Sequence, residues 1–297
     1  MLIRVLPVLP VLALAAAAVS PLFAQQPQLS EEERARRMAE YMEQVKKDLA
    51  TPTPIQALDS VWIEELTWME VRDAMAAGKT TAIVSTGGIE QNGPYVATGK
   101  HNYILESSCE MIARQLGDAL CAPIIKLVPE GSIDPPSGHM LYPGTISVRQ
   151  ETFEAMLEDV VSSLKAHGFE TVALIGDSGG NQRGMKNVAE RLNERWGQKI
   201  ALFVPEYYAN DEVMRFMNED LGIVEPKNDG LHDFYWATAM QMVTDPATVR
   251  YDERVAAGKA MINGVSIAPK EDSIKVGRQL LQVRVEATVA AIQSATR

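Results

Sequence analysis

Short apolar runs that end at glycines alternate along this chain with amphipathic helices. Residues 81–85 and 171–176 are two such runs, and residues 149–167 carry apolar side chains at helical spacing before a glycine. Strands that alternate with helices of this length are typical of βαβ units, in which helices cover both faces of a parallel sheet. The sequence therefore predicts an α/β fold with a mostly parallel sheet.

Weaker periodic segments complete this pattern. The remaining expected elements are helices at 63–77, 102–117, 182–196, 212–218, 234–243 and 273–296, and strands at 122–128 and 199–204. The long loop over residues 129–145 is rich in proline and glycine, and a loop of this length inside a compact domain is usually functional.

The first 24 residues have the pattern of a secretory signal peptide. Arg4 precedes an apolar stretch over residues 5–19, and Ala24 is a small residue at the expected cleavage position. An uncleaved membrane anchor is the alternative, but the stretch is short and contains prolines. We therefore expect a secreted or periplasmic protein that is cleaved after Ala24.

Residues 25–60 are expected to precede the main domain as a separate piece, and residues 61–297 to form the α/β domain. Residues 31–49 carry an apolar stripe at helical spacing, and Ser30 and Glu33 have the spacing of a capping box. Prolines then end the helix. The sequence predicts an N-terminal helix and linker, which either packs on a neighbouring subunit or stays solvated.

Charge and cysteine content restrict the partners and the covalent links. The chain has 39 acidic and 28 basic residues, a net charge of −11, which argues against binding to nucleic acid or to an anionic membrane. A small-molecule substrate is the expected partner. Cys109 and Cys121 are the only cysteines. Export would permit a disulfide, and two buried free thiols are the equal alternative.

Three of the four histidines lie in predicted loops, beside glycines or acids. These are His101, His139 and His232, and they accompany Glu90 and Asp177, which follow the two apolar runs. Loops at the carboxyl ends of neighbouring parallel strands meet in space. A carboxylate–imidazole set of Glu90, His101 and Asp177 would bind a divalent metal. In the alternative interpretation, Glu90 caps a turn and Asp177 accepts backbone amides.

The loop after the second apolar run also contains a serine in the pattern Gly-x-Ser-x-Gly. Ser178 would be the nucleophile of such an elbow, and His232 after Glu206 or Asp229 would complete a triad in the right chain order. The loop lacks the lysine of a phosphate-binding P-loop. A serine hydrolase mechanism therefore stays open beside the metal site.

Four sequence blocks, in order along the chain, carry a family resemblance. They are Leu66-Thr-Trp-Met-Glu-Val71, Gly88-Ile-Glu-Gln-Asn-Gly-Pro-Tyr95, Gly138-His-Met-Leu-Tyr-Pro-Gly-Thr-Ile-Ser147 and Gly176-Asp-Ser-Gly-Gly-Asn181. They resemble the opening helix and the Glu-Gln-His-Gly-Pro-His, His-x-x-Phe-Pro-Gly-Thr and Gly-His-Gly-Gly-Asn segments of the creatininase (creatinine amidohydrolase) family. The resemblance implies a three-layer αβα sandwich, homo-oligomers, and a hydrolase of amide or other C–N bonds that holds two divalent ions.

The chain departs from the family pattern at its expected ligands. Asn92 stands where the family has a histidine ligand, His101 where it has aspartate, and Asp177 where it has histidine. His232 resembles the catalytic histidine, but the glutamate expected after it is Ala237. The exchanges at His101 and Asp177 compensate one another, because together they keep one imidazole and one carboxylate on the same two loops. A neutral amide at Asn92, in contrast, is a poor ligand for a divalent metal ion. These departures lead us to expect one metal site rather than two.

Together these observations favour an exported hydrolase that acts on an amide or cyclic C–N bond through a metal-activated water. Its cofactor would be one Zn²⁺ or Mn²⁺ ion, with Fe²⁺ as a further candidate, bound by Glu90, His101 and Asp177. Catalysis would use Glu90 and His232, the latter for proton transfer. The expected substrate-binding residues are Asn92, His139, Ser178 and Asn181. A non-catalytic small-molecule-binding protein on the same scaffold and the serine hydrolase using Ser178 are the alternatives.

Overall fold

The computed structural model describes residues 29–297, so the expected signal peptide lies outside the described residues. The chain divides into two compact units, residues 1–52 and 53–297, and each is described by itself. Within residues 29–297, no helix is both long enough and apolar enough to cross a bilayer.

The described part of the first unit is the helix α1 (Glu31–Ala50). The predicted capping box is confirmed: Glu33 N donates to Ser30 Oγ at 3.2 Å, and Ser30 N donates to Glu33 Oε2 at 3.1 Å. The apolar stripe of this helix, which includes Met38 and Tyr41, is exposed.

The second unit is built on a four-stranded parallel sheet in the order β2-β1-β3-β4. Its strands are β1 (Thr81–Thr86), β2 (Ala119–Cys121), β3 (Thr171–Gly176) and β4 (Ala201–Phe203). The chain moves outward from β1 in one direction to β2 and in the other direction to β3. The carboxyl ends of β1 and β3 therefore form a topological switch point, where α/β proteins usually bind ligands.

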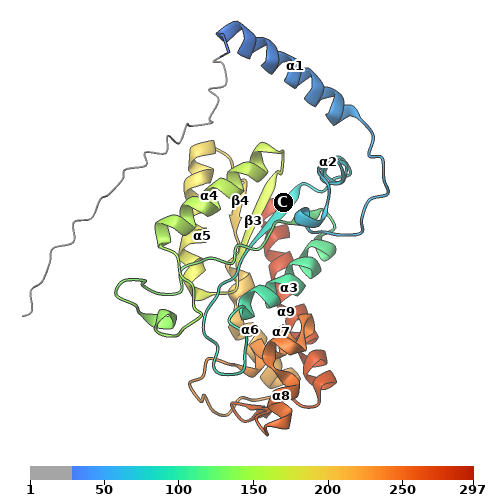
Figure 1. Cartoon of the computed structure of the whole chain (residues 1–297). Helices are drawn as coiled ribbons and strands as arrows, with labels where there is room; N and C mark the ends of the chain where they lie inside the picture. The colour runs from blue at the N-terminus through green and yellow to red at the C-terminus, as the bar shows by residue number, and fades with distance from the viewer. Residues whose placement is uncertain (1–28) are drawn as a thin grey trace, which may run out of the picture. The chain divides into compact units, whose positions relative to one another are not determined.

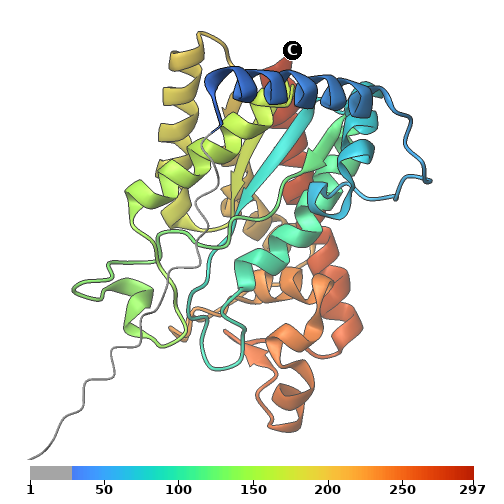
Figure 2. The same ribbon diagram turned by 45° about the horizontal axis from the view of Figure 1, so that its top comes forward.

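Helices cover both faces of the sheet (Figures 1 and 2). Val84 and Leu174 belong to one apolar cluster and Ile83 and Ile175 to another, as expected for alternation along strands. The first cluster includes α2 (Trp68–Ala76), α4 (Gln150–Ala166) and α5 (Gly179–Trp196), and the second includes α3 (Lys100–Leu116) and α9 (Lys270–Thr296). The expected three-layer αβα architecture is confirmed.

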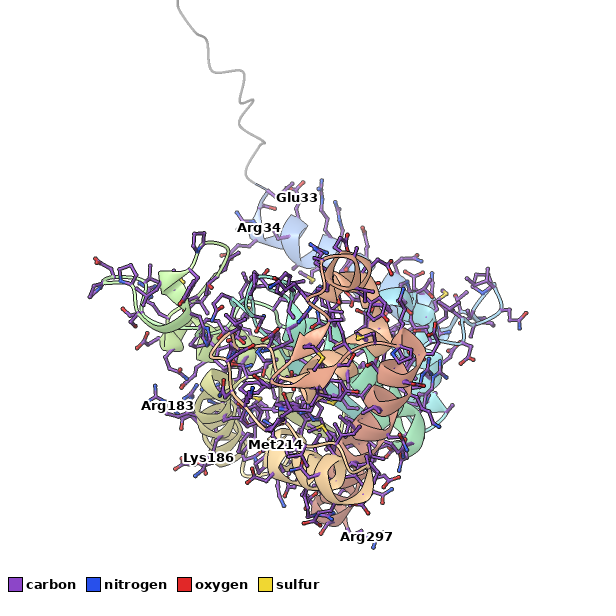
Figure 3. All side chains as sticks on the ribbon, turned by 90° about the horizontal axis from the view of Figure 1, so that it is seen from below. Glu33, Arg34, Arg183, Lys186, Met214 and Arg297 are labelled. Carbon is purple, nitrogen blue, oxygen red and sulfur yellow. A yellow bond between two sulfur atoms is a disulfide. The ribbon has the colours of Figure 1, made fainter. Side chains whose placement is uncertain are left out.

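Helix α5 shows how the sequence divides its faces. Gly184 and Met185 are buried, whereas Arg183 and Lys186 are exposed and extend away from the body of the unit in Figure 3. A side chain at Gly184 would come within 2.7 Å of the Phe153 ring on α4. The glycine therefore allows α4 and α5 to pack closely on the sheet.

A helical layer beyond the sheet is centred on α7 (Tyr235–Thr244), which packs against α9. A side chain at Gly277 of α9 would collide with the backbone of Ala239 in α7, so these two helices are in backbone contact. The other elements here are α6 (Asn210–Arg215), a π-helix (Phe216–Asp220), α8 (Tyr251–Ala256) and the hairpin β5 (Met261–Ile262) and β6 (Val265–Ser266). Short 3-10 helices cover Ile63–Glu65, Gly138–Leu141, Pro205–Tyr208 and Pro246–Val249.

Two expected elements differ from the structure. The strand predicted at residues 122–128 is wrong: β2 ends at Cys121, and Ile125 makes only an isolated bridge to Thr86. Pro123 has no N–H to donate to the sheet, which explains the early end. The helix predicted at residues 63–77 is interrupted, because Thr67 caps a new helix, α2.

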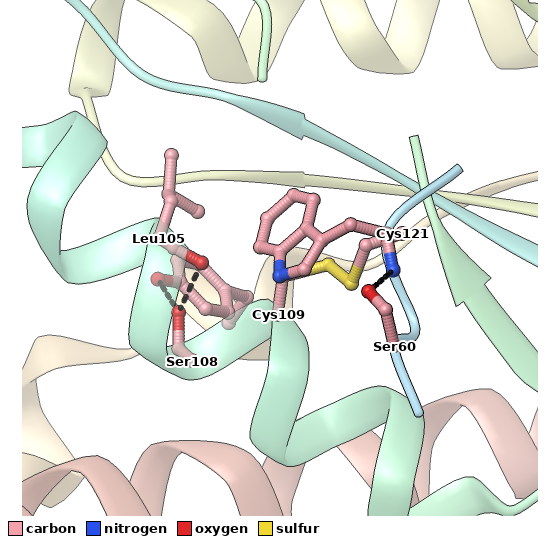
Figure 4. Close-up of a disulfide and its surroundings, with 7 residues drawn as sticks. Ser60, Leu105, Ser108, Cys109 and Cys121 are labelled. Carbon is pink, nitrogen blue, oxygen red and sulfur yellow. Dashed lines mark hydrogen bonds between the residues drawn. A yellow bond between two sulfur atoms is a disulfide. The ribbon is translucent and has the colours of Figure 1, made fainter. Parts of the chain in front are cut away.

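A disulfide joins Cys109 in α3 to Cys121 in β2, which settles the question that the sequence left open (Figure 4). Both sulfurs are buried in the apolar cluster on the α3 face of the sheet. Ser108, the residue before Cys109, has its Oγ 2.7 Å from the hydroxyl of Tyr207. The disulfide thus fixes α3, whose first turn contributes to the site described below.

Glu70 provides a pH-dependent contribution to stability. Backbone hydrogen bonds from Thr67 and Leu58 hold the pKa of the Glu70 carboxyl below its ordinary value of 4.5. A carboxyl whose pKa is lowered on folding stabilises the native state above its unfolded pKa, and this contribution is lost as the pH falls through the folded pKa. We expect Glu70→Gln to lower the melting temperature at pH 7, and the difference from wild type to shrink below about pH 4. Thermal unfolding across pH 3 to 7 measures this, and a difference that grows on acidification would contradict it.

Candidate metal centre

The loop after β1 brings Glu90 to the switch point. Gly87 and Gly88 let this loop pass other side chains, because a Cβ at Gly87 would collide with Asn102 and one at Gly88 with Glu130. The Asn102 amide fixes the turn, donating to Gly88 O at 2.9 Å and accepting from Gly88 N at 3.3 Å. Glu90 is consequently buried, with 2% of its surface exposed.

The Glu90 carboxylate lies at the centre of four basic side chains. Its Oε1 is 2.7 Å from His101 Nε2, 3.0 Å from His232 Nε2 and 3.3 Å from Lys100 Nζ. Its Oε2 is 3.2 Å from His139 Nε2. Three loops and the start of α3 therefore meet on one carboxylate. Burial favours the neutral acid, but hydrogen bonds from His101 and His232 hold the pKa of Glu90 well below its ordinary value.

Glu90, His139 and His232 form a group that could hold a metal ion. Their ligand atoms all lie within 4.8 Å of one another. Burial lowers the pKa of His139 although the Glu90 charge acts in the opposite direction, and this favours the neutral imidazole, the form that binds metals. His232 has a φ of 65°, a left-handed conformation that is uncommon for residues other than glycine. This turn aims its ring at Glu90.

His101 has a different environment. Its Nε2 faces Glu90, and its Nδ1 lies 2.7 Å from Asp177 Oδ2. Burial and the Lys100 charge act to lower the pKa of His101, but the hydrogen bonds to the two carboxylates raise it above its ordinary value. Both ring nitrogens therefore face carboxylates, and the structure joins His101 to Asp177 and Glu90 in one buried chain.

Arg284 of α9 completes this chain from the other side. Its guanidinium pairs with Asp177 Oδ1 and also lies over the ring of Tyr207, 5.0 Å from the ring centre. Burial acts to raise the pKa of Asp177, but the Arg284 charge and the hydrogen bond from His101 hold it below its ordinary value. Arg284 is 2% exposed, so this is a buried ion pair.

A second acid, Glu130, faces Glu90 from the long loop that follows β2. Burial, reinforced by the negative charge of Glu90, raises the pKa of Glu130 to about 8. Its Oε1 is buried without a hydrogen-bond partner within residues 29–297. Sequence reasoning missed both Glu130 and Lys100. Their signals were position alone: Glu130 begins the long loop that carries His139, and Lys100 directly precedes His101.

The other predicted substrate-binding residues have mixed positions. His139 and Ser178 line a cavity of about 440 Å³ beside Glu90. Asn92 and Asn181 instead hold loop backbones: Asn92 Nδ2 donates to Glu90 O at 3.0 Å, and Asn181 Nδ2 donates to Gly87 O at 2.8 Å.

Ser178 has the contacts of a helix cap. Its Oγ accepts a hydrogen bond from Gly180 N at 3.4 Å at the start of α5. Within residues 29–297, no histidine hydrogen-bonds to this hydroxyl, as a serine nucleophile would require in an assembled triad.

Three aromatic side chains also line the cavity: Tyr208, Phe234 and Trp236. The rings of Phe234 and Trp236 are stacked with centres 6.1 Å apart, and the His232 ring meets the edge of Phe234 at 5.9 Å. The cavity lining therefore combines aromatic rings with carboxylates and imidazoles.

Comparisons with solved structures support the fold. A creatininase described with Mn has a TM-score of 0.60 and 20% identity, and the match covers 80% of this chain and 98% of that chain. A mutant creatininase of Zn–Zn type has a TM-score of 0.58 at 20% identity, with the same coverage.

Sequence comparison identifies the family. A creatinine amidohydrolase of Pseudomonas putida is 27% identical over 116 residues, which is 39% of this chain and 44% of that protein. The match thus spans less than half of the relative's length. A family model described as creatininase, creatinine amidohydrolase, matches residues 64–292, which is most of the chain. This protein therefore belongs to the creatininase family.

Proposed function

We propose that this protein is a hydrolase of amide or cyclic C–N bonds that holds one divalent ion on Glu90, His139 and His232. The observation that carries the proposal is the grouping of these ligand atoms within 4.8 Å beside a cavity. Two imidazoles and one carboxylate suit Zn²⁺, Mn²⁺ or Fe²⁺, so the donor set fits such an ion. A bound divalent ion would supply Lewis acidity and lower the pKa of water in the cavity.

The chain's own residues would prepare the substrate and move the proton. The aromatic rings of Phe234 and Trp236 would pack against a flat amide or small ring, which positions its carbonyl toward Glu90. Glu130 would hold and transfer a proton, because its unpartnered Oε1 is buried beside Glu90. His101, held by Asp177, would orient the Glu90 carboxylate.

Metal content tests this ligand set against the one expected from the sequence. We expect purified protein refilled with Zn²⁺ or Mn²⁺ to hold one equivalent and His139→Ala to hold none, by elemental analysis. His101→Asn, the matched control, should still reach one equivalent, with about 10- to 100-fold weaker affinity as for an orienting neighbour. Loss of metal in His101→Asn with retention in His139→Ala would favour the set Glu90, His101 and Asp177.

The absence of any metal in wild type after refilling would contradict the hydrolase proposal. A non-catalytic binding protein would then be the better interpretation. The serine mechanism would be tested separately with a serine-directed phosphonate, which should inactivate the protein by reacting with Ser178.

We further propose that the protein is exported and forms homo-oligomers. The disulfide between Cys109 and Cys121 supports export, because such bonds persist in oxidising compartments. The exposed side chains of Leu141 and Tyr142, on the loop that carries His139, support association with another subunit. Sedimentation of the mature protein and N-terminal sequencing of the exported form test the two proposals.

A further inference from the structure

Lys100 is a buried cation that the proposed function has not yet used. It is the first residue of α3, its side chain is 3% exposed, and its Nζ lies 3.3 Å from Glu90 Oε1. It also lines the cavity. Lysine is almost never this buried without a charge partner, because removing an ammonium from water is costly.

The charges around the cavity show what this ammonium would do once an ion is bound. Arg284 pairs with Asp177, and among residues 29–297 the carboxylate within ion-pair distance of Lys100 Nζ is that of Glu90. A divalent ion on Glu90 would more than neutralise that carboxylate. The Lys100 charge would then be in excess, inside a cavity where charge interactions are strong.

Two donors that the family resemblance leads us to expect for a second ion are replaced here by Asn92 and Ala237. Asn92 turns its amide toward backbone carbonyls, with Nδ2 3.0 Å from Glu90 O and 3.3 Å from Ala97 O. Ala237 lines the cavity with a methyl group in place of the carboxylate expected from the family resemblance. The Lys100 ammonium instead brings a positive charge to the same carboxylate, 3.3 Å from Glu90 Oε1.

We propose that Lys100 is the second cation of this centre: its ammonium replaces a second metal ion beside Glu90 and stabilises negative charge on the substrate oxygen. This rests on the proposed function. In amide hydrolysis, the oxygen of water bonds to the carbonyl carbon, and the carbonyl electron pair moves onto its oxygen. That pair returns as the C–N bond breaks, and the leaving nitrogen takes a proton that water gave up. Lys100 would stabilise the oxygen while it carries the charge.

Two titrations test this without a known substrate, on wild type, Lys100→Met and the charge-conserving control Lys100→Arg. In the first, Zn²⁺ alone is titrated into metal-free protein by calorimetry. We expect one equivalent in all three proteins and about tenfold or more tighter binding in Lys100→Met, because a like charge near the ion is gone. In the second, acetate is titrated into the Zn²⁺-loaded proteins as an anionic probe. We expect about tenfold weaker acetate binding in Lys100→Met and little change in Lys100→Arg.

The two affinities should therefore move in opposite directions, which a merely structural role would not produce. Two equivalents of Zn²⁺ in wild type would overturn the inference, and so would unchanged or weaker Zn²⁺ binding in Lys100→Met. Unchanged acetate binding would overturn the role toward the substrate oxygen. If Lys100→Met does not fold, Lys100→Gln takes its place with the same expectations. A wild-type protein that binds no Zn²⁺ would be a different result, because it would contradict the proposed function rather than the role of Lys100.

Discussion

Replacing Glu90 by glutamine is expected to abolish stoichiometric metal binding. The substitution keeps the size of the side chain but removes the negative charge that faces His101, His139, His232 and Lys100. A divalent ion would lose its only carboxylate in the proposed ligand set. The Lys100 ammonium would also stay buried without a counter-charge, so the free energy of unfolding should fall by about 3 kcal/mol.

Elemental analysis after refilling and urea denaturation measure these two effects. The matched control is Glu130→Gln, which makes the same carboxylate-to-amide change in the same cavity and should still bind one equivalent. Metal binding by Glu90→Gln at the wild-type level would contradict the assignment of Glu90 as the central ligand.

Replacing Arg284 by methionine is expected to cause the largest loss of stability outside the apolar core. Asp177 would remain buried against His101 with no guanidinium, and removal of one partner from a buried ion pair usually costs about 3–5 kcal/mol. Urea denaturation gives the free energy of unfolding. Arg278→Met on the exposed side of the same helix is the control and should change stability by less than about 0.5 kcal/mol.

A double-mutant cycle with Asp177→Asn separates the ion pair from other effects. The double variant should be less destabilised than the sum of the single variants, because the amide leaves no buried charge behind. A cost below about 1 kcal/mol for Arg284→Met would show that Asp177 has other compensation.

The α/β fold could be predicted because its signals are local. The continuous apolar run Thr171–Gly176 and the glycine after residues 149–167 each specify an element within a few residues of chain. The failure at residues 122–128 has the same origin, since apolar content there resembles a strand but Pro123 cannot donate to the sheet. Periodicity reports burial more directly than it reports hydrogen bonding.

The site could be predicted only in part, because its contacts join distant segments. The sequence pattern selected Glu90 and three histidines, and the structure places all four together. The prediction that His101 lies in a loop is wrong, because α3 begins at Lys100 and His101 belongs to its first turn. Nothing in the local sequence indicated that the His101 ring lies between two carboxylates, whereas the His139 and His232 rings contact only Glu90 among the acids described at the site. The register of the last motif adds to this ambiguity, since Ser178, not Asp177, stands three residues before Asn181, as the family histidine does before its asparagine.

Lys100, Glu130 and Arg284 were missed for a related reason. Each acts through charge in a buried place, and burial of a polar residue cannot be read from its immediate neighbours. Their partners lie on other loops and helices, so only the tertiary structure shows that Arg284 compensates Asp177 or that Lys100 faces Glu90.

The position of Arg284 on α9 also has a consequence for biosynthesis. Arg284 is the 107th residue that the ribosome adds after Asp177. Until then, the nascent chain contains Asp177 and His101 but not the guanidinium that pairs with Asp177. The sheet and its early helices can begin to assemble during synthesis, whereas the centre at their carboxyl ends closes only after α9 has left the ribosome and docked.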